Sequence, residues 1–294
     1  MDIHDLSVFA AAARHGSVTK AAQSLSTVQS NVTTRIRLLE TELNVQLFHR
    51  NHRGITLTQK GQQLLPYAQQ MLSLLEHARA AVADSREVGG TLHIGALQST
   101  ATARLPDVLK TYATRHARVD ISVETGTSMD LIAKVLESKL DGAFVSGVED
   151  HPALDVITSY VEELVIVTPA AFRSVKTYLK HSALPKTLVF KIGCHYRQRL
   201  EQYLGAEGAK MLSPMDFGTI DGIIGCVAAG LGISMLPRSV VERSSRRKEI
   251  AIHQLPKAHR YVETQFVTHK AQVQPLALTR LIDVIVGQRE AKAR

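Results

Sequence analysis

The stretch SVTKAAQSLSTVQSNVTTRIRLLETEL, residues 17–43, decides the fold of the amino-terminal part of the chain. Its apolar residues recur at helical spacing in two runs, which are separated by a polar break at Ser26–Thr27. The small residues Ala21 and Ala22 stand where the two runs would cross. The inner face of the second run carries Val32, Ile36, Leu39 and Leu43. Two helices joined by a tight turn, with alanines at the crossing, form the helix-turn-helix pattern.

A further helix precedes this pair, and a hairpin follows it. Apolar residues from Ile3 to Ala13 recur at spacings of three and four, which predicts a helix that turns at His15–Gly16. Downstream, the basic segment HRNHRG, residues 49–54, lies between Leu47–Phe48 and ITLT, residues 55–58. This order predicts a basic two-strand wing, and residues 1–58 are therefore expected to form a winged helix-turn-helix.

The opening turn of the second helix carries short polar side chains of the kind that reach base edges in the major groove of DNA. Gln29 and Asn31 are candidates for reading adenine, whereas the arginines suit the phosphate backbone or, in the wing, a minor groove. The alternative is a small helical domain whose polar faces are only solvated. The candidate DNA contacts are Gln29, Ser30, Asn31, Thr33, Thr34, Arg35, Arg37, Arg50 and Arg53.

A long helix is expected next, over residues 59–88. Pro66 is the only helix breaker there, and one apolar stripe runs from Leu64 to Val82. The body of the same chain could bury this stripe, but its length and its polar opposite face favour a second copy of itself. We therefore predict a linker and dimerisation helix in residues 59–90, which the pair Gly89–Gly90 ends.

The remaining residues, 91–294, alternate strand-like and helix-like runs, which predicts an α/β domain with a largely parallel sheet. The expected helices cover residues 105–115, 128–139, 195–204, 220–229 and 275–289. The expected strands cover residues 91–97, 119–124, 142–146, 163–168, 187–192, 232–236, 249–254 and 261–268.

The amino-acid composition is that of an ordinary folded protein, and its positive net charge favours an acidic partner. Among 294 residues, 35 Lys and Arg stand against 27 Asp and Glu, giving a net charge of +8 that favours nucleic acid without demanding it. The first residues lack a basic leader pattern, and no apolar run approaches the roughly 20 residues that cross a membrane. We therefore expect a cytoplasmic protein that does not contact membranes.

The chain resembles the LysR-type transcription regulators over essentially its full length. The resemblance rests on SVTKAA (17–22) with Leu25, VQSNVTTRI (28–36) with Leu39–Glu40, LFHR (47–50) and LTQKG (57–61). It implies a winged helix-turn-helix, a linker helix and an effector domain of two Rossmann-like lobes resembling periplasmic binding proteins. Many members have Ser-Arg where this chain has Thr33–Thr34, so that a frequent DNA contact is missing or is supplied by Arg35.

GCHYR (193–197) and GIIGCVAAGLGISMLP (222–237) resemble the second lobe of the same family. The resemblance implies two crossings between the lobes, near Glu163–Leu164 and near Phe266–Val267. Lobe one would then comprise residues 91–162 and 268–294, and lobe two residues 163–267.

Backbone N–H groups at the junctions of strands and helices would face the cleft between the lobes and favour a polar or anionic ligand. The segment GTSMD (126–130) has the pattern of a capped helix start. The alternative for Ser99, Thr127 or Thr219 is a purely structural role, in which each residue only caps a helix. The resemblance implies an effector pocket lined by Ser99, Thr100, Thr127, Ser128, Cys194, His195, Phe217 and Gly218.

The two cysteines, Cys194 and Cys226, are too few for a disulfide framework and have no metal-binding spacing. A helix start at Cys194 would lower its thiol pKa and allow it to sense oxidants, although a buried inert or ligand-lining thiol is favoured. No metal cluster, nucleotide loop or catalytic constellation is legible, so neither a cofactor nor an enzymatic activity is expected.

These observations predict a DNA-binding regulator controlled by a small effector. Its expected partners are double-stranded DNA, the effector and further copies of the chain, as a dimer and, as is usual in the family, a tetramer; RNA polymerase is a candidate partner. The main alternative is a regulator that needs no effector or responds to thiol oxidation. The attached basic domain argues against a transport binding protein, and the lack of a legible catalytic constellation argues against an enzyme.

Overall fold

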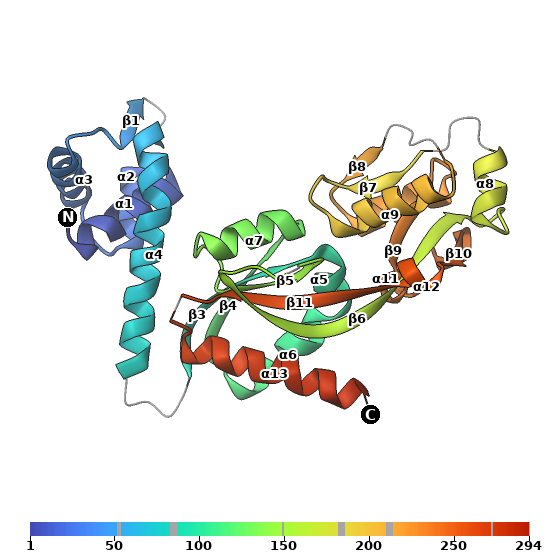
Figure 1. Cartoon of the computed structure of the whole chain (residues 1–294). Coiled ribbons are helices and arrows are strands. Elements are labelled where there is room, and N and C mark those ends of the chain that lie inside the picture. The colour runs from blue at the N-terminus through green and yellow to red at the C-terminus, as the bar shows by residue number, and fades with distance from the viewer. Residues whose placement is uncertain are drawn as a thin grey trace. The chain divides into compact units, whose positions relative to one another are not determined.

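A computed structural model describes residues 1–51, 54–82, 88–148, 150–181, 186–209, 214–271 and 273–293. The chain divides into two compact units, Met1–Arg86 and Glu87–Arg294 (Figure 1). No helix in the described part is both long enough and apolar enough to span a bilayer.

The amino-terminal unit confirms the predicted winged helix-turn-helix. Its core is built from the inward faces of the first three helices together with Leu47, Phe48 and Ala68. Ring packing of Phe9 on Phe48, with centroids 5.4 Å apart, ties the first helix to the wing. The elements are α1 (Ile3–His15), α2 (Val18–Ser24), α3 (Gln29–Leu43), β1 (Phe48–Asn51), β2 (Gly54–Leu57) and α4 (Gln59–Val82).

A close backbone contact holds the wing on the turn between α1 and α2. Gly16 ends α1 with a φ of 60°, and its carbonyl oxygen accepts a hydrogen bond from Ile55 at 3.0 Å. A Cβ atom on Gly54 would lie 2.4 Å from that same oxygen, so only glycine fits there.

Helix α4 confirms the predicted helix over its described part. It runs to Val82, and the segment 83–87 lies outside the described residues, whereas Val88 is not helical. Ala68 is buried and Leu64 and Leu65 pack against the core of the amino-terminal unit. The stripe predicted for self-association is therefore partly covered by this chain.

The carboxy-terminal unit is built on a seven-stranded sheet in the order β10-β6-β11-β5-β3-β4, with β9 also paired to β6. β3 pairs in parallel with β4 and β5, but the other pairings, β10–β6, β9–β6, β11–β5 and β11–β6, are antiparallel. The predicted largely parallel sheet is therefore wrong. The strands are β3 (Gly89–Ala96), β4 (Arg118–Thr125), β5 (Gly142–Ser146), β6 (Leu154–Pro169), β9 (Ser234–Pro237), β10 (Ile250–Gln254) and β11 (Tyr261–His269).

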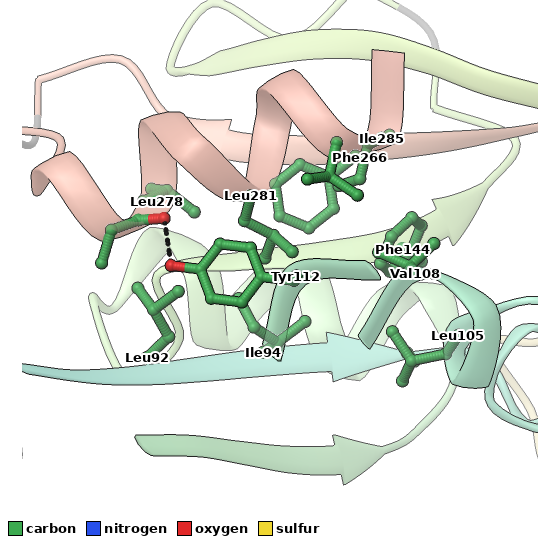
Figure 2. Packing of buried hydrophobic residues seen from close by; sticks show 13 residues of the cluster. Leu92, Ile94, Leu105, Val108, Tyr112, Phe144, Phe266, Leu278, Leu281 and Ile285 are labelled. Atoms are coloured by element: carbon green, nitrogen blue, oxygen red, sulfur yellow. Dashed lines mark hydrogen bonds between the residues drawn. The ribbon is translucent and has the colours of Figure 1, made fainter. Parts of the chain in front are cut away.

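Lobe one comprises β3, β4 and β5 with the helices that cover them. α6 and α13 cover one face of the sheet and α7 the other (Figure 1). In the core, the hydroxyl of Tyr112 donates to the carbonyl of Ala277 at 2.8 Å, and Phe144 packs on Phe266 (Figure 2). The helices are α5 (Gln98–Ala103), α6 (Leu105–Arg115), α7 (Ser128–Leu136) and α13 (Leu276–Ala293).

Lobe two comprises β9, β10 and a separate parallel pair of strands, of which Met215–Phe217 was not predicted. Two clusters of buried residues, on α9 and on α10, fill its interior. The elements are β7 (Leu188–Phe190), β8 (Met215–Phe217), α8 (Val175–His181), α9 (His195–Ala206), α10 (Ile220–Ala228), α11 (Arg238–Arg243), η1 (Arg247–Glu249) and α12 (Lys257–Arg260).

The lobes are joined by the two long antiparallel strands, β6 and β11. β6 already begins at Leu154, well before the predicted strand at Glu163, and passes from one lobe into the other without a break. β11 pairs with β5 of lobe one through Thr264–Val267. The return crossing is therefore near Tyr261–Glu263, a few residues before the predicted Phe266–Val267.

Candidate nucleic-acid interface and candidate ligand cavity

The opening turn of α3 is polar and exposed. Gln29, Ser30 and Thr34 are exposed, whereas Asn31 and Thr33 are half-buried. The amide nitrogen of Gln29 donates to the Thr19 hydroxyl at 2.8 Å, and that of Asn31 donates to the Thr27 hydroxyl at 3.0 Å. Each amide keeps its oxygen and a second N–H for another partner. The hydrogen bonds fix the two side chains before any ligand arrives.

Val28 is a feature of this turn that the sequence interpretation missed. It occupies the N-cap position of α3, makes no side-chain cap and is 65% exposed. In contrast, Asp2, Ser17, Thr127 and Thr219 each cap their helix with a side-chain oxygen. An exposed apolar residue at a helix start was legible in the sequence as a departure from the preferred cap residues.

The two arginines of α3 that were predicted to contact the DNA backbone have different surroundings. Arg37 is exposed and has no ion-pair partner among the described residues. Arg35 instead donates from Nη1 to Asp2 at 3.2 Å and to Asp5 at 3.0 Å, and the hydrogen bond to Asp5 raises the pKa of the Arg35 guanidinium. In the wing, Arg53 and the side chain of Arg50 lie outside the described residues.

A cavity of about 210 Å³ lies between the lobes of the carboxy-terminal unit. It sits at the carboxyl ends of β3, β4, β7 and β8, where α/β proteins commonly bind ligands. Its lining comprises Leu97, Gln98, Ser99, Thr125, Gly126, Thr127, Asp130, Phe190, Lys191, Cys194, Tyr196, Phe217 and Gly218.

The structure brings together five of the eight predicted pocket residues: Ser99, Thr127, Cys194, Phe217 and Gly218. The other three do not line the cavity. Thr100 is fully buried and accepts a hydrogen bond from Tyr160, and the hydroxyl of Ser128 joins α7 to β5 through Ser146. The ring of His195 lies against Gly147 of lobe one, where it would clash with any Cβ.

The amino-terminal ends of α7 and α9 form part of the cavity wall. The hydroxyl of Thr127 accepts from the Asp130 N–H at 3.2 Å, which confirms the predicted capped start of α7. Cys194 begins α9 without a side-chain cap. Lys191 adds a positive charge, and Leu97, Phe190 and Phe217 supply apolar surface. The wall thus suits a small ligand that has both a polar or anionic group and an apolar part.

A buried carboxylate next to the cavity connects the two lobes. Glu162 on β6 is 2% exposed. It accepts from Tyr196 at 3.3 Å and from Ser239 at 3.2 Å, and Arg104 Nε lies 3.8 Å away. Tyr196 also bonds Ser99, at 3.1 Å, across the cavity wall. Burial raises the pKa of Glu162 above its usual value, and the positive charge of Arg104 opposes this shift.

The surroundings of Cys194 fit the favoured expectation of a buried thiol and do not support the alternative that it senses oxidants. Cys194 does begin a helix, but burial dominates and raises the pKa of its thiol, whereas the backbone N–H groups of Tyr196 and Arg197 lower it only in part. Both cysteines are free. Among the described residues, no three His, Cys, Asp or Glu side chains gather closely enough to hold a metal ion.

Both units match family models. Residues 3–62 match the bacterial regulatory helix-turn-helix protein of the lysR family, and residues 85–289 match the LysR substrate binding domain. The chain belongs to the LysR family of transcriptional regulators. The amino-terminal unit of this LysR regulator is thus its DNA-binding helix-turn-helix, and the carboxy-terminal unit is its effector-binding domain.

Curated relatives cover nearly the whole chain. An uncharacterized HTH-type transcriptional regulator of Bacillus subtilis (strain 168), YusT, is 41% identical and covers 100% of this chain and 98% of its own. GltR of the same organism is 40% identical over 92% of this chain and 91% of its own. SoxR of Arthrobacter sp. (strain TE1826) is 37% identical over 99% of this chain and 98% of its own.

Solved structures share the fold at low identity. A full-length OxyR from Pseudomonas aeruginosa has a TM-score of 0.72 and 19% identity and covers 97% of this chain and 94% of its own. Full-length CbnR in complex with its target DNA has a TM-score of 0.71 and 21% identity and covers 98% of this chain and 99% of its own.

The buried carboxylate predicts how stability depends on pH. Because folding raises the pKa of Glu162 above its ordinary 4.5, the folded state binds the proton more tightly than the unfolded state. The contribution of Glu162 to stability is therefore full below that pH and declines as the pH rises through the folded-state pKa. We expect Glu162→Gln, which cannot ionise, to gain stability relative to the unaltered protein from about pH 4 to about pH 8.

Urea unfolding of both proteins across this pH range measures the difference in unfolding free energy. A difference that stays constant, or that moves in favour of the unaltered protein as the pH rises, would contradict the assignment.

Proposed function

We propose that this LysR regulator reads base edges with the first turn of α3, and that a small polar or anionic effector binds the cavity between the lobes. The observation that carries the DNA-reading role is the exposed, polar opening turn on the second helix of a helix-turn-helix. That position enters the major groove in proteins of this architecture. Arg37 supplies a phosphate contact beside it, and Arg50 and Arg53 of the wing keep their predicted role.

Gln29 and Asn31 are matched to adenine. The amide oxygen can accept from adenine N6 while the remaining N–H donates to N7, and such a bidentate pair discriminates against other bases by about 1–3 kcal/mol. Ser30, Thr33 and Thr34 extend the polar surface along the same helix. Intramolecular bonds to Thr19 and Thr27 orient the two amides, which reduces the entropy lost on binding.

Val28 is matched to the methyl group of thymine. A serine, threonine or aspartate in its place would stabilise α3 by about 0.5–2 kcal/mol. The exposed Val28 cannot make this capping hydrogen bond and places an apolar side chain beside the polar side chains of Gln29 and Asn31. Contact with the C5-methyl group is the apolar counterpart of base-edge hydrogen bonding in the major groove.

Self-association is proposed through α4. Tyr67, Met71 and Leu74 follow one another at spacings of four and three, so they share a face of the helix, and each is exposed by 46–64% of its area. We assign a second copy of α4 as the partner of this face, giving a dimer. A tetramer made of two such dimers and contact with RNA polymerase stay predictions.

The polar wall of the cavity supports control by an effector. The amino-terminal ends of α7 and α9 and the charge of Lys191 favour an anionic group, and the aromatic side chains favour an apolar part. Occupancy of the cavity by an effector would stabilise one arrangement of the lobes over another. Cys194 is buried, which limits the access of oxidants to its thiol and raises the thiol pKa, and this burial disfavours a regulator that responds through Cys194.

Arg37 and Gln29 predict separable effects on DNA binding. A duplex enriched from a random-sequence library by the unaltered full-length protein serves as the probe, with a scrambled duplex beside it. Arg37→Gln should lower the slope of log affinity against log salt by about 0.9 on both duplexes, because one phosphate contact is lost. Gln29→Ala should cost about 1–3 kcal/mol on the enriched duplex alone. Equal binding by all three proteins would refute the proposed interface.

Val28 predicts sensitivity to one methyl group. When deoxyuridine replaces each thymine of the enriched duplex in turn, one position should cost the unaltered protein about 0.8 kcal/mol, roughly fourfold in affinity, the value of one buried methyl. Val28→Ser should lose this discrimination while its unfolding free energy rises by about 1 kcal/mol through the new cap. If every deoxyuridine duplex binds both proteins alike, Val28 does not read thymine.

The cavity predicts a ligand that stabilises the carboxy-terminal unit. Across a panel of small mono- and dicarboxylates, at least one should raise the midpoint of thermal unfolding of the full-length protein. Gly218→Leu should abolish this rise, because Gly218 lines the cavity and has open space for a side chain.

The matched control is Gly205→Leu, which also has open space around it but lies outside the cavity lining. An equal thermal response in both variants would place the ligand elsewhere.

A further inference from the structure

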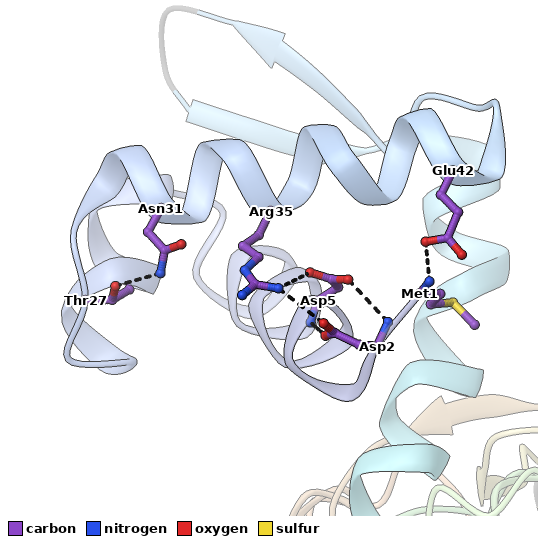
Figure 3. A network of polar contacts seen from close by, with 7 residues as sticks. All are labelled: Met1, Asp2, Asp5, Thr27, Asn31, Arg35 and Glu42. Carbon is purple, nitrogen blue, oxygen red and sulfur yellow. Dashed lines mark hydrogen bonds and ion pairs between the residues drawn. The ribbon is translucent and has the colours of Figure 1, made fainter.

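Arg35 is held by two carboxylates at the start of another helix. Its Nη1 atom donates to Asp2, the N-cap residue of α1, and to Asp5 in the first turn of that helix (Figure 3). The Asp5 side chain is 11% exposed and that of Arg35 33% exposed, so solvent screens this contact less than it screens a fully exposed pair.

The two carboxylates are themselves fixed by the helix they cap. Asp2 accepts from the Asp5 N–H at 2.8 Å, and Asp5 accepts from the Asp2 N–H at 3.2 Å, so the pair forms a reciprocal capping box. The carboxylates therefore have little freedom to follow Arg35. Any tilt of α3 on α1 would stretch or break the contact.

The local charge argues against a phosphate contact by Arg35. One guanidinium and two carboxylates sum to a net charge of −1, and the Met1 ammonium beside them is paired with the Glu42 carboxylate. A phosphate that approaches Arg35 also approaches Asp2 and Asp5. Repulsion between these like charges offsets the attraction to the guanidinium. Arg37, two residues along the same helix, is exposed and has no such neighbours among the described residues.

The position of Arg35 links this contact to the reading turn. Arg35 lies six residues after Gln29, about 9 Å along the axis of α3 at 1.5 Å per residue. Val32, Ile36 and Leu39 pack α3 against the core, but apolar packing alone allows small changes of tilt. A directional contact in the middle of the helix removes this freedom.

We propose that Arg35 is a positioning residue. Its contact with Asp2 and Asp5 fixes the orientation of α3 relative to α1 and thereby places the first turn of α3 so that it can contact the bases. The inference rests on the proposed reading role of that turn. It replaces the phosphate contact that the sequence suggested for Arg35.

The test measures binding of the full-length protein to the enriched duplex and to its scrambled counterpart over a range of salt concentrations. Arg35→Gln should weaken binding to the enriched duplex about tenfold, leave the scrambled duplex unaffected and leave the salt slope unchanged. Asp5→Asn should act in the same direction, and the double variant should bind no more weakly than the weaker single variant, because both changes break one contact. Arg35→Lys should retain most of the affinity, since a single nitrogen makes both contacts.

Arg37→Gln is the matched control, because it removes a charge from the same helix and should lower the salt slope on both duplexes. Asp2→Asn serves as a milder variant if Asp5→Asn unfolds, since the Asp2 side chain is 59% exposed. Thermal unfolding of each sample checks that the fold is kept.

The proposal would be overturned if Arg35→Gln lowered the slope of log affinity against log salt and Asp5→Asn bound DNA more tightly. Arg35 would then be a phosphate contact that the carboxylates restrain. If Gln29→Ala alters discrimination between the duplexes and Arg35→Gln does not, only the positioning role is overturned. If neither alters it, the reading role of α3 fails as well.

Discussion

Burial of one face of α3 fixes which of its side chains can reach DNA. Val32, Ile36 and Leu39 are almost fully buried in the core formed with α1 and α2. Because a helix turns once every 3.6 residues, fixing this face also fixes which side chains face outward. The polar turn that begins at Gln29 is presented to solvent as a consequence, and the exposed Val28 precedes it. Polar contacts within the unit then refine the orientation that the apolar packing sets.

The carboxy-terminal unit depends on a different constraint, the pair of long strands that both lobes share. β6 and β11 run antiparallel through both lobes, so movement of one lobe relative to the other must bend these strands. Glu162 sits on β6 among partners from both lobes, and a carboxylate in that position is costly unless its partners stay in place. Ser99 and Tyr196 belong both to this network and to the cavity wall. An effector that changes their contacts would therefore act directly on the junction between the lobes.

Much of the architecture was predictable because it follows from local periodicity and from residues adjacent in the sequence. The alanines at the helix crossing, the hairpin wing and the capped start of α7 are of this kind. Strand direction was not predictable, because the alternation of side chains is the same in parallel and antiparallel strands. Contacts between residues far apart in the sequence were also not predictable, because periodicity reports only local structure. Asp5 is 30 residues from Arg35, and Tyr196 is 34 residues from Glu162. Which neighbouring side chain lines the cavity was also not predictable: Tyr196 lines it, whereas the adjacent His195 does not.

The most direct test of the central claim is an experimental structure of the full-length protein bound to a duplex that it has selected. We predict that the first turn of α3 lies in the major groove with Gln29 and Asn31 within hydrogen-bonding distance of base edges. A complex in which that turn faces solvent while another surface contacts the bases would contradict it.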